Sequence, residues 1–162
     1  MRKDLKAIYD ANLRDFGSLP EEKIMALTLW AESRGEPLAG KIAVGTVIMN
    51  RVDHRAWDGK TIKEVCLWPK QFSCFNPDDA QRERMVDFAE DHLFCFDFSP
   101  ALKDCHLIAT GLLKGVIQPD KDILNSKCCQ YLTTAAKAHC NWWKKMRFVK
   151  KIGNHEFYWD LI

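Results

Sequence analysis

A single carboxylate, Glu32, lies in the segment best suited to chemistry, residues 30–37 with the sequence Trp-Ala-Glu-Ser-Arg-Gly-Glu-Pro. The segment ends one apolar-patterned stretch and precedes a second, so Glu32 is expected where a helix runs into a turn. A carboxyl group with little access to water has its charged form disfavoured, which raises its pKa and lets it donate a proton near neutral pH. Cleavage of a glycosidic bond needs such an acid. A solvated glutamate at a helix end fits these eight residues equally well.

A second glutamate, Glu36, follows four residues later. On an unbroken helix the two carboxylates would share one face. Gly35 and Pro37 argue against an unbroken helix. We therefore expect Glu36 to hold the turn, for example by bonding Arg34 or free backbone amides.

Three further positions offer weaker chemistry. The amide and hydroxyl of Gln71-Phe72-Ser73 suit the hydroxyl and N-acetyl groups of a sugar, or they satisfy local backbone groups. Tyr131, in a polar loop, places a phenol beside a cleft or is a core aromatic residue with a solvated tip. His155 is interpreted as a hydrogen-bonded structural histidine rather than a catalytic base.

Other chemistries have less support. Seven cysteines and five histidines make a chance Cys/His pairing easy, so a nucleophilic pair carries little weight. The sequence has no C-x-x-C, no H-E-x-x-H, no Gly-rich phosphate loop and no G-x-S-x-G motif. We expect neither a metal nor another cofactor.

Size and composition predict one globular domain over residues 1–162. The chain is 47% hydrophobic and 28% charged, which excludes a disordered protein, and its net charge of +2 gives little reason to expect a nucleic-acid partner. Basic residues do gather at 144–147 and 150–151. We interpret them as a solvated face, with a polyanionic target as the less favoured alternative.

The odd number of cysteines predicts mostly buried, reduced thiols in a protein made in the cytosol. No apolar h-region follows Met1, so no signal peptide is expected. No run of about 18 apolar residues is present, so we expect no membrane insertion. We also expect a monomer.

Periodicity and capping signals predict most of the helices. The Ser18-Leu19-Pro20-Glu21 capping box begins a helix that stops near 33–35, and a second, buried helix begins at Leu38. The remaining helical predictions are a short helix after Thr61 that Pro69 ends, a longer one capped by Asp78 or Asp79 and reaching Phe96, and one from Ser99-Pro100 to Gly115.

The other segments are less regular. Residues 1–20 are expected to be an arm or a helix, and Asp58-Gly59 a turn. We expect mostly loop over 116–134, a short helix over 135–146, and two extended pieces on either side of Gly153-Asn154. The predicted fold is mainly α, with a small extended hairpin portion.

Four motifs in the same order resemble those of the SleB-type cell wall hydrolases. They are Ala-Glu-Ser-Arg-Gly-Glu at 31–36, a G-x-x-A-V…N-R-V pattern at 40–52, Gln-Phe-Ser at 71–73 and Ile-Gly-Asn-His-Glu-Phe-Tyr at 152–158. The resemblance implies a lysozyme-like, mostly helical fold acting on the glycan strands of peptidoglycan. It also implies that Glu32 is the catalytic acid for the bond between N-acetylmuramic acid and N-acetylglucosamine.

Several family members are lytic transglycosylases, in which one carboxyl protonates the leaving oxygen and then accepts the proton of the muramyl 6-hydroxyl. The family's T-H-Y-H-like segment corresponds here to Cys129-Gln130-Tyr131-Leu132, which keeps the tyrosine and lacks both histidines. Our hypothesis is a lytic transglycosylase of the phage endolysin type, made in the cytoplasm and released late in infection. The alternatives are a hydrolytic muramidase, an inactive wall-binding module and a Cys-dependent peptidase.

Overall fold

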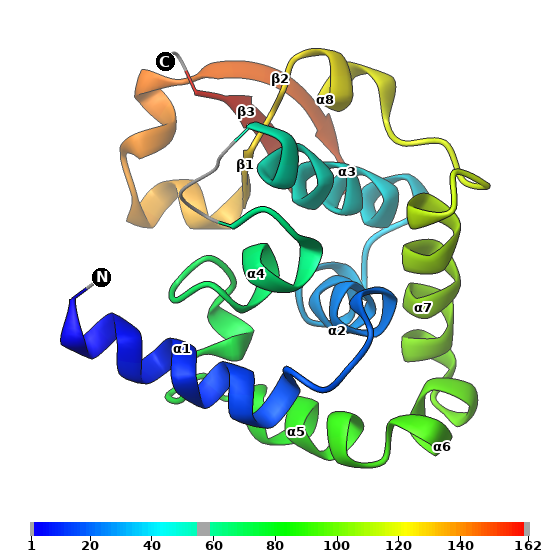
Figure 1. Ribbon diagram of the computed structural model, residues 1–162. Coiled ribbons are helices and arrows are strands. Elements are labelled where there is room, and N and C mark those ends of the chain that lie inside the picture. The colour runs from blue at the N-terminus through cyan, green and yellow to red at the C-terminus, as the bar shows by residue number, and fades with distance from the viewer. Residues whose placement is uncertain (1, 55–58, 161–162) are drawn as a thin grey trace.

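The computed structural model describes residues 2–54 and 59–160 and consists of helices with one small antiparallel sheet (Figure 1). The helices are α1 (Lys3–Phe16), α2 (Glu21–Ser33), α3 (Leu38–His54), α4 (Ile62–Leu67), α5 (Arg82–Glu90), α6 (His92–Phe98), α7 (Pro100–Leu113) and α8 (Lys121–Asn125). Short 3-10 helices are η2 (Ser73–Phe75), η3 (Ala135–His139) and η4 (Trp142–Lys145), and the strands are β1 (Gln130–Thr133), β2 (Arg147–Ile152) and β3 (His155–Trp159). The prediction of a mainly helical fold with a small hairpin is confirmed.

Helix α2 lies at the centre of the helical part, packed against α3, α4 and α7 (Figure 1). Every residue from 24 to 29 is buried, so α2 is covered on all sides rather than along one stripe. Helix α3 is buried in the same way from 43 to 48. The prediction of a buried second helix beginning at Leu38 is therefore confirmed.

The sheet has the strand order β1-β3-β2, with both pairs antiparallel. Strands β2 and β3 form the predicted hairpin, and its turn contains Gly153 with a φ of +56°. Tyr131 of β1 lies opposite Phe157 of β3, which places both on the face that packs on the helical core. The strand β1, which precedes the hairpin in the sequence, therefore completes the sheet by pairing with β3.

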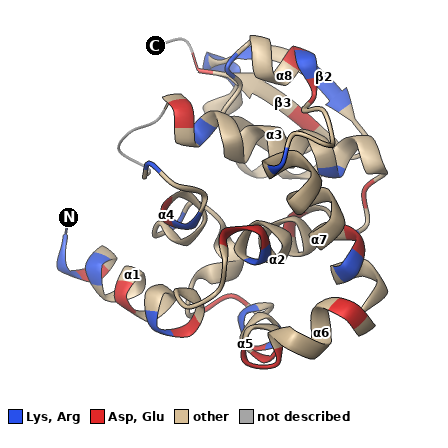
Figure 2. Cartoon of the chain, turned by 45° about the vertical axis from the view of Figure 1, so that its right-hand side comes forward, with Lys and Arg blue, Asp and Glu red and all other residues tan. Residues whose placement is uncertain are grey.

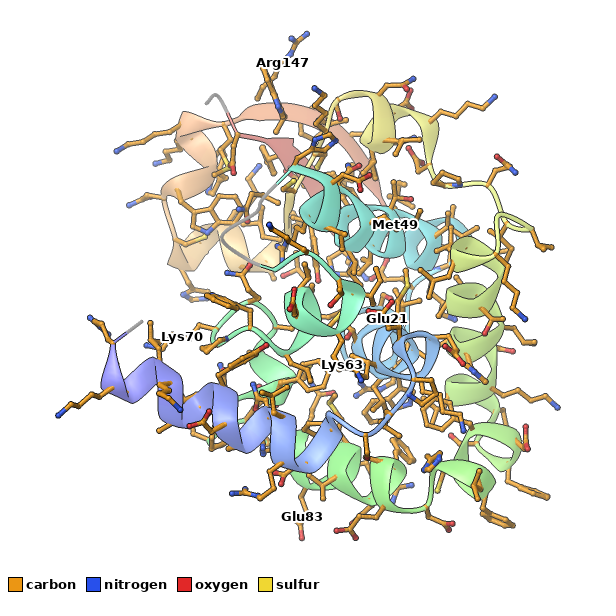
Figure 3. The ribbon with its side chains drawn as sticks, in the orientation of Figure 1. Glu21, Met49, Lys63, Lys70, Glu83 and Arg147 are labelled. Atoms are coloured by element: carbon orange, nitrogen blue, oxygen red, sulfur yellow. The ribbon has the colours of Figure 1, made fainter. Side chains whose placement is uncertain are left out.

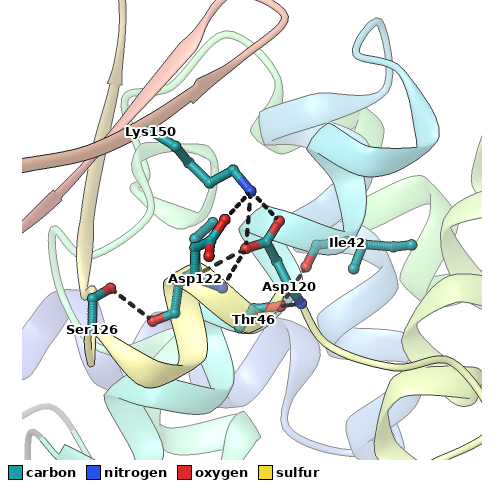
Figure 4. A network of polar contacts seen from close by, with 7 residues as sticks. Ile42, Thr46, Asp120, Asp122, Ser126 and Lys150 are labelled. Atoms are coloured by element: carbon teal, nitrogen blue, oxygen red, sulfur yellow. Dashed lines mark hydrogen bonds and ion pairs between the residues drawn. The ribbon is translucent and has the colours of Figure 1, made fainter.

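A polar network joins α3, α8 and β2 (Figure 4). The carboxylate of Asp120 caps α8 by accepting from the backbone amides of residues 122 and 123, and its own amide donates to Thr46 Oγ1 at 3.0 Å. Lys150 of β2 donates to Asp120 at 3.0 Å and to Asp122 at 2.8 Å. The edge strand is therefore held against two helices.

Two predictions for the second half of the chain need correction. Residues 116–134 are loop at just over half of their positions, but they also contain α8 and β1, which the loop prediction left out. Asp120 is a local cap signal that was missed, whereas β1 has only the distant residues 155–158 as its hydrogen-bonding partners. Residues 135–146 form two 3-10 turns instead of one helix, separated at Cys140, whose backbone is extended.

Two helix boundaries also differ from prediction. Ser18 does not cap α2, which begins at Glu21 after an extended Pro20, while Glu21 accepts from the amide of Lys63 at 3.3 Å (Figure 3). The long helix predicted up to Phe96 divides into α5 and α6, because Asp91 (φ −107°, ψ 40°) leaves the helical region. Its cap is also wrong: α5 follows Gln81, which makes no side-chain capping bond.

The remaining boundaries agree with prediction. Thr61 caps α4 by accepting from the amide of Glu64 at 3.1 Å, and α7 begins at Pro100. Residues 3–16 form a helix, one of the two alternatives for the N-terminal segment. Asp58 of the predicted turn lies outside the described residues. Across the described residues, we find no helix with the length and apolarity needed to span a membrane.

Asn50 generates a test of how the sheet side is attached to α3. Its buried amide nitrogen donates to the carbonyls of Ile123 and Cys128, each at 2.9 Å. Asn50→Ala leaves both carbonyls unsatisfied, so we expect the free energy of unfolding to fall by about 2–3 kcal/mol in denaturant titration. The control Asn125→Ala, at an exposed position, should change it by less than about 0.5 kcal/mol. Equal losses in the two variants would contradict this role.

Candidate active site

Glu32 lies in the last turn of α2, at the point where the chain leaves the helix. The helix ends at Ser33, whose hydroxyl donates to the carbonyl of Leu29 at 2.9 Å. The C-terminal end of a helix carries partial negative charge, which disfavours a carboxylate there. The predicted position at a helix end is confirmed, and the side chain of Glu32 is half-buried rather than exposed as a solvated glutamate would be.

The phenol of Tyr131 donates a hydrogen bond to Glu32 Oε2 at 2.7 Å, across 99 residues of sequence. Burial raises the pKa of Glu32, and the charge of Asp79 adds to this increase. The Tyr131 hydrogen bond and the charge of Arg51 oppose it. Burial and the neighbouring Glu32 carboxylate raise the pKa of Tyr131 well above its usual value, so the phenol keeps its proton. The pair can therefore hold a protonated acid with a fixed orientation.

Arg51 of α3 is a site residue that the sequence reasoning missed. Its side chain is almost fully buried, its Nε donates to the carbonyl of Cys129 at 2.9 Å, and its guanidinium lies 4.8 Å from the ring centre of Phe72. Its Nη1 has no hydrogen-bond partner among the described residues. Arg51 belongs to the N-R-V motif, so the sequence did contain a signal for it. Nothing in the spacing of that motif showed that the charge of Arg51 acts on Glu32.

His155 is 3% exposed, and its ring stands edge-on to Tyr131 with ring centres 5.2 Å apart. Its Nδ1 has no hydrogen-bond partner within the described part of the chain, so the prediction of a hydrogen-bonded histidine is wrong for this atom. Burial lowers the pKa of His155, which keeps the ring neutral at pH 7. The neutral ring of His155 therefore packs against the ring of Tyr131 and limits its movement.

The Gln71-Phe72-Ser73 segment precedes α5 and packs near α2 through η2. Phe72 is 2% exposed and lies in the core against Arg51, which leaves almost none of its ring for a ligand. Ser73 is exposed and Gln71 half-buried, and no hydrogen bond of either side chain is found in the described residues. The local backbone therefore does not engage these two side chains.

Arg34 and Glu36 have separate structural roles. Arg34 stacks on Trp30 at 4.2 Å and bonds the last carbonyls of α2 and the Gln81 side chain. Glu36 accepts from the backbone amide of Asn154 at 3.0 Å and from its side chain at 3.1 Å. The expected bond to free backbone amides is thus found, whereas no bond to Arg34 is found among the described residues. The clamp fixes the turn immediately before His155.

The described residues contain no group of three or more His, Cys, Asp and Glu side chains placed to hold a metal ion. Five of the seven cysteines are buried, and Cys66, Cys74, Cys95, Cys105, Cys128 and Cys140 form no disulfide within the described residues. Burial raises the pKa of Cys66 to about 12, so this thiol stays protonated. The thiol nearest in sequence to Ser73, Cys74, also has its pKa raised well above the usual value by burial.

Comparison with known proteins agrees with this arrangement. A family model described as Cell Wall Hydrolase matches residues 35–158. The spore cortex-lytic enzyme of Oceanobacillus iheyensis is 32% identical over 72 residues, which are 40% of this chain and 26% of that enzyme. The match therefore spans about a quarter of the length of this relative.

Two solved structures share the fold. The catalytic domain of the germination-specific lytic transglycosylase SleB from Bacillus anthracis is 25% identical with a TM-score of 0.59, covering 85% of this chain and 93% of that one. The catalytic domain of the Bacillus cereus SleB protein is also 25% identical, with a TM-score of 0.54, covering 85% and 88%. The fold is therefore that of a lysozyme-like, SleB-type catalytic domain. The chain belongs to the cell wall hydrolase family.

The Glu36 clamp leads to a prediction at Gly153. A Cβ built there would lie within van der Waals overlap of Glu36 Oε2, and the φ of +56° is strained for other residues. Gly115 is a matched control, because its φ is +70° and nothing lies within 4 Å of a built Cβ. We expect Gly115→Ala to lower the free energy of unfolding by about 1–2 kcal/mol and Gly153→Ala by roughly twice as much. Equal losses would show that the clamp adds nothing.

The raised pKa of Glu32 predicts a pH-dependent cost to stability. The folded protein holds this proton above pH 4.5, the ordinary pKa, where the unfolded chain releases it, so stability falls as pH rises through this range. Glu32→Gln removes this cost. We expect its free energy of unfolding to match the wild type near pH 4 and to exceed it at pH 8.

The control for this titration is Glu83→Gln on the exposed surface of α5 (Figure 3). It should show no such pH-dependent gain. A Glu32→Gln curve that stays parallel to the wild type would mean that Glu32 is not held in an unfavourable site.

Proposed function

We propose that this chain cleaves the glycan strands of peptidoglycan between N-acetylmuramic acid and N-acetylglucosamine, as a lytic transglycosylase with Glu32 as its acid and base. The observation that carries this proposal is the half-buried carboxyl of Glu32, with a raised pKa and a 2.7 Å hydrogen bond from Tyr131. The family membership and the likeness to SleB, whose name describes a lytic transglycosylase, support the substrate and the reaction.

The geometry supports a two-step role for one carboxyl group. Protonated Glu32 donates to the leaving glycosidic oxygen as the bond to muramyl C1 breaks, which leaves an oxocarbenium-like centre. The muramyl 6-hydroxyl then attacks C1, and its proton passes to the Glu32 carboxylate. The Tyr131 phenol and the Arg51 charge stabilise the carboxylate between these steps, and His155 keeps the phenol in place.

We propose that Gln71 and Ser73 make the sugar-binding contacts, because their side chains form no hydrogen bond to any described residue. Tyr131 and Phe72 complete the proposed sugar-binding set. Phe72 acts through Arg51, against which it packs. Arg34, Glu36 and His155 are supporting residues. Because Glu32 and Tyr131 meet within one chain, we also propose that the enzyme acts as a monomer.

Hydrolysis is the second candidate, because the charge of Asp79 acts on Glu32. A second carboxylate near the acid could activate water, as it does in inverting glycosidases. This candidate predicts reducing ends and loss of cleavage in Asp79→Asn. The transglycosylase predicts 1,6-anhydro ends and continued cleavage in that variant.

We further propose that the protein is made in the cytoplasm and reaches the wall when the host cell lyses, as a phage endolysin does. The free thiols of Cys66, Cys74, Cys95, Cys105, Cys128 and Cys140 support synthesis in a reducing compartment.

Muropeptide mass spectrometry with purified sacculi tests the proposed function. We expect wild-type protein to release 1,6-anhydro muropeptides and Glu32→Gln to lower the rate by at least about 1000-fold, because the amide has no transferable proton. The unfolding curve of the same variant shows that it is folded. Lysis by Glu32→Gln at the wild-type rate would overturn the assignment, and cleaved peptide cross-links would indicate a peptidase instead.

A further inference from the structure

The two faces of the sheet have different surroundings. Tyr131, His155 and Phe157 share the face that packs on the helical core and contacts Glu32. The register places Glu156 and Tyr158 of β3 on the opposite face, beside Lys151 and Phe148 of β2. This opposite face, which we call the outer face, lies away from the proposed catalytic carboxyl.

The η3–η4 segment forms a hollow on the outer face. Lys137 bonds Glu156 at 2.7 Å and lies 4.0 Å from the ring centre of Trp143, while the Tyr158 hydroxyl donates to Glu156 at 2.6 Å. The hollow has a volume of about 380 Å³, and its lining includes Trp143, Phe148 and Tyr158 together with Lys137, Lys144, Lys151 and Glu156. Its walls are therefore aromatic and carry three cations and one carboxylate, which is paired with Lys137.

Charge is distributed very unevenly along the sequence. Residues 123–155 contain seven of the 24 Lys and Arg residues and none of the 22 Asp and Glu residues, so the rest of the chain has a net charge of −5. Figure 2 shows basic residues along β2 and acidic residues on α5 and α6 at the other end of the molecule. The positive charge is thus concentrated on the sheet side of a nearly neutral protein.

Most of these cations have no carboxylate partner. Lys137 is paired with Glu156, and Lys150 with Asp120 and Asp122. Of the seven cations in 123–155, the other five are exposed and have no ion pair to any described residue: Lys127, Lys144, Lys145, Arg147 and Lys151. Arg147 points outward from the sheet end (Figure 3). Ion pairs within the described part of the fold therefore do not explain why these five cations are present.

We propose that the outer face binds a phosphodiester-linked polymer of the cell wall, of the poly(polyol phosphate) type. Lys144 and Lys151 at the hollow, with Lys145 next to Lys144 in η4, provide spaced cations for the repeating phosphates. The aromatic rings of the hollow offer surfaces for the polyol or sugar carbons between them. This inference rests on the proposed function, because the wall is where an enzyme of this kind meets such a polymer.

The series of separate cations favours a repeating anion over a single one. A lone phosphate or carboxylate in the hollow would leave the neighbouring Lys145 of η4 without a partner. Because the outer face lies opposite to Glu32, a polymer bound there leaves the glycan strand free to enter the proposed active site. Binding of the polymer would then hold the enzyme on the wall between cleavage events.

Cosedimentation with purified walls tests the inference. The walls carry a poly(glycerol phosphate) polymer and are used before and after hydrofluoric acid removes it. We expect wild-type protein to bind phosphate-bearing walls at least about tenfold more tightly than stripped walls at low salt, and to lose this difference at 0.5 M NaCl.

A double variant and its matched control locate the surface. Lys144→Gln/Lys151→Gln should lose about tenfold in affinity for phosphate-bearing walls and cleave stripped walls at the wild-type rate. Lys103→Gln/Lys114→Gln makes the same change in net charge at exposed positions of α7 and its C-cap, and should bind as the wild type does.

Three outcomes would overturn the inference: equal binding to stripped walls, equal losses in the two double variants, or equal competition by single-stranded RNA and by poly(glycerol phosphate). Binding and cleavage are scored separately. Absence of anhydro products from stripped walls contradicts the proposed function, whereas phosphate-independent binding by a protein that cleaves contradicts only the inference drawn here.

Discussion

The hydrogen bond from Tyr131 to Glu32 is the interaction on which the arrangement of the site depends. It joins the end of the central helix α2 to the first strand of the sheet, and it holds a carboxyl group whose side chain is half-buried. Burial of an ionisable group costs free energy unless the group is neutral or well partnered. Burial therefore favours the protonated form of this carboxyl group. The hydrogen bond from the Tyr131 phenol opposes this effect by stabilising the charged carboxylate. The opposing effects suit a group that must both release and regain a proton.

The residues that hold the sheet against the helices come from a short stretch of sequence. Glu36 clamps the β2–β3 turn, Asn50 binds one carbonyl within α8 and one between α8 and β1, and Arg51 binds the next carbonyl along. The Asn-Arg pair is thus explained by its targets, because only side chains with several donors can satisfy backbone carbonyls at this junction. The same contacts bring Arg51 towards Glu32. Anchoring the sheet and adjusting the charge of the site are consequences of one set of bonds.

Local signals in the sequence predicted the features that local chemistry determines. Gly35 and Pro37 end α2 just after Glu32, and Gly153 allows the hairpin turn, so both were identified correctly. The approach of Tyr131 to Glu32 was outside the reach of spacing arguments, because it depends on β1 pairing with β3 and on β3 facing the core. For the same reason Arg51 was recognised only as part of a motif. Phe72 was predicted as part of the sugar-binding segment, yet its ring is in the core.

The sheet separates two kinds of chemistry by the alternation of its strands. Successive residues of β3 point to opposite faces, so His155 and Phe157 contact Tyr131 on the core side while Glu156 and Tyr158 line the hollow on the outer face. A register shift of one residue would exchange these two sets. It would bring a carboxylate against Glu32 and make the acid harder to ionise. The Glu36 clamp at the hairpin turn and the Lys150 bonds at the edge strand hold that register, so the separation of the two faces follows from the contacts that position the site.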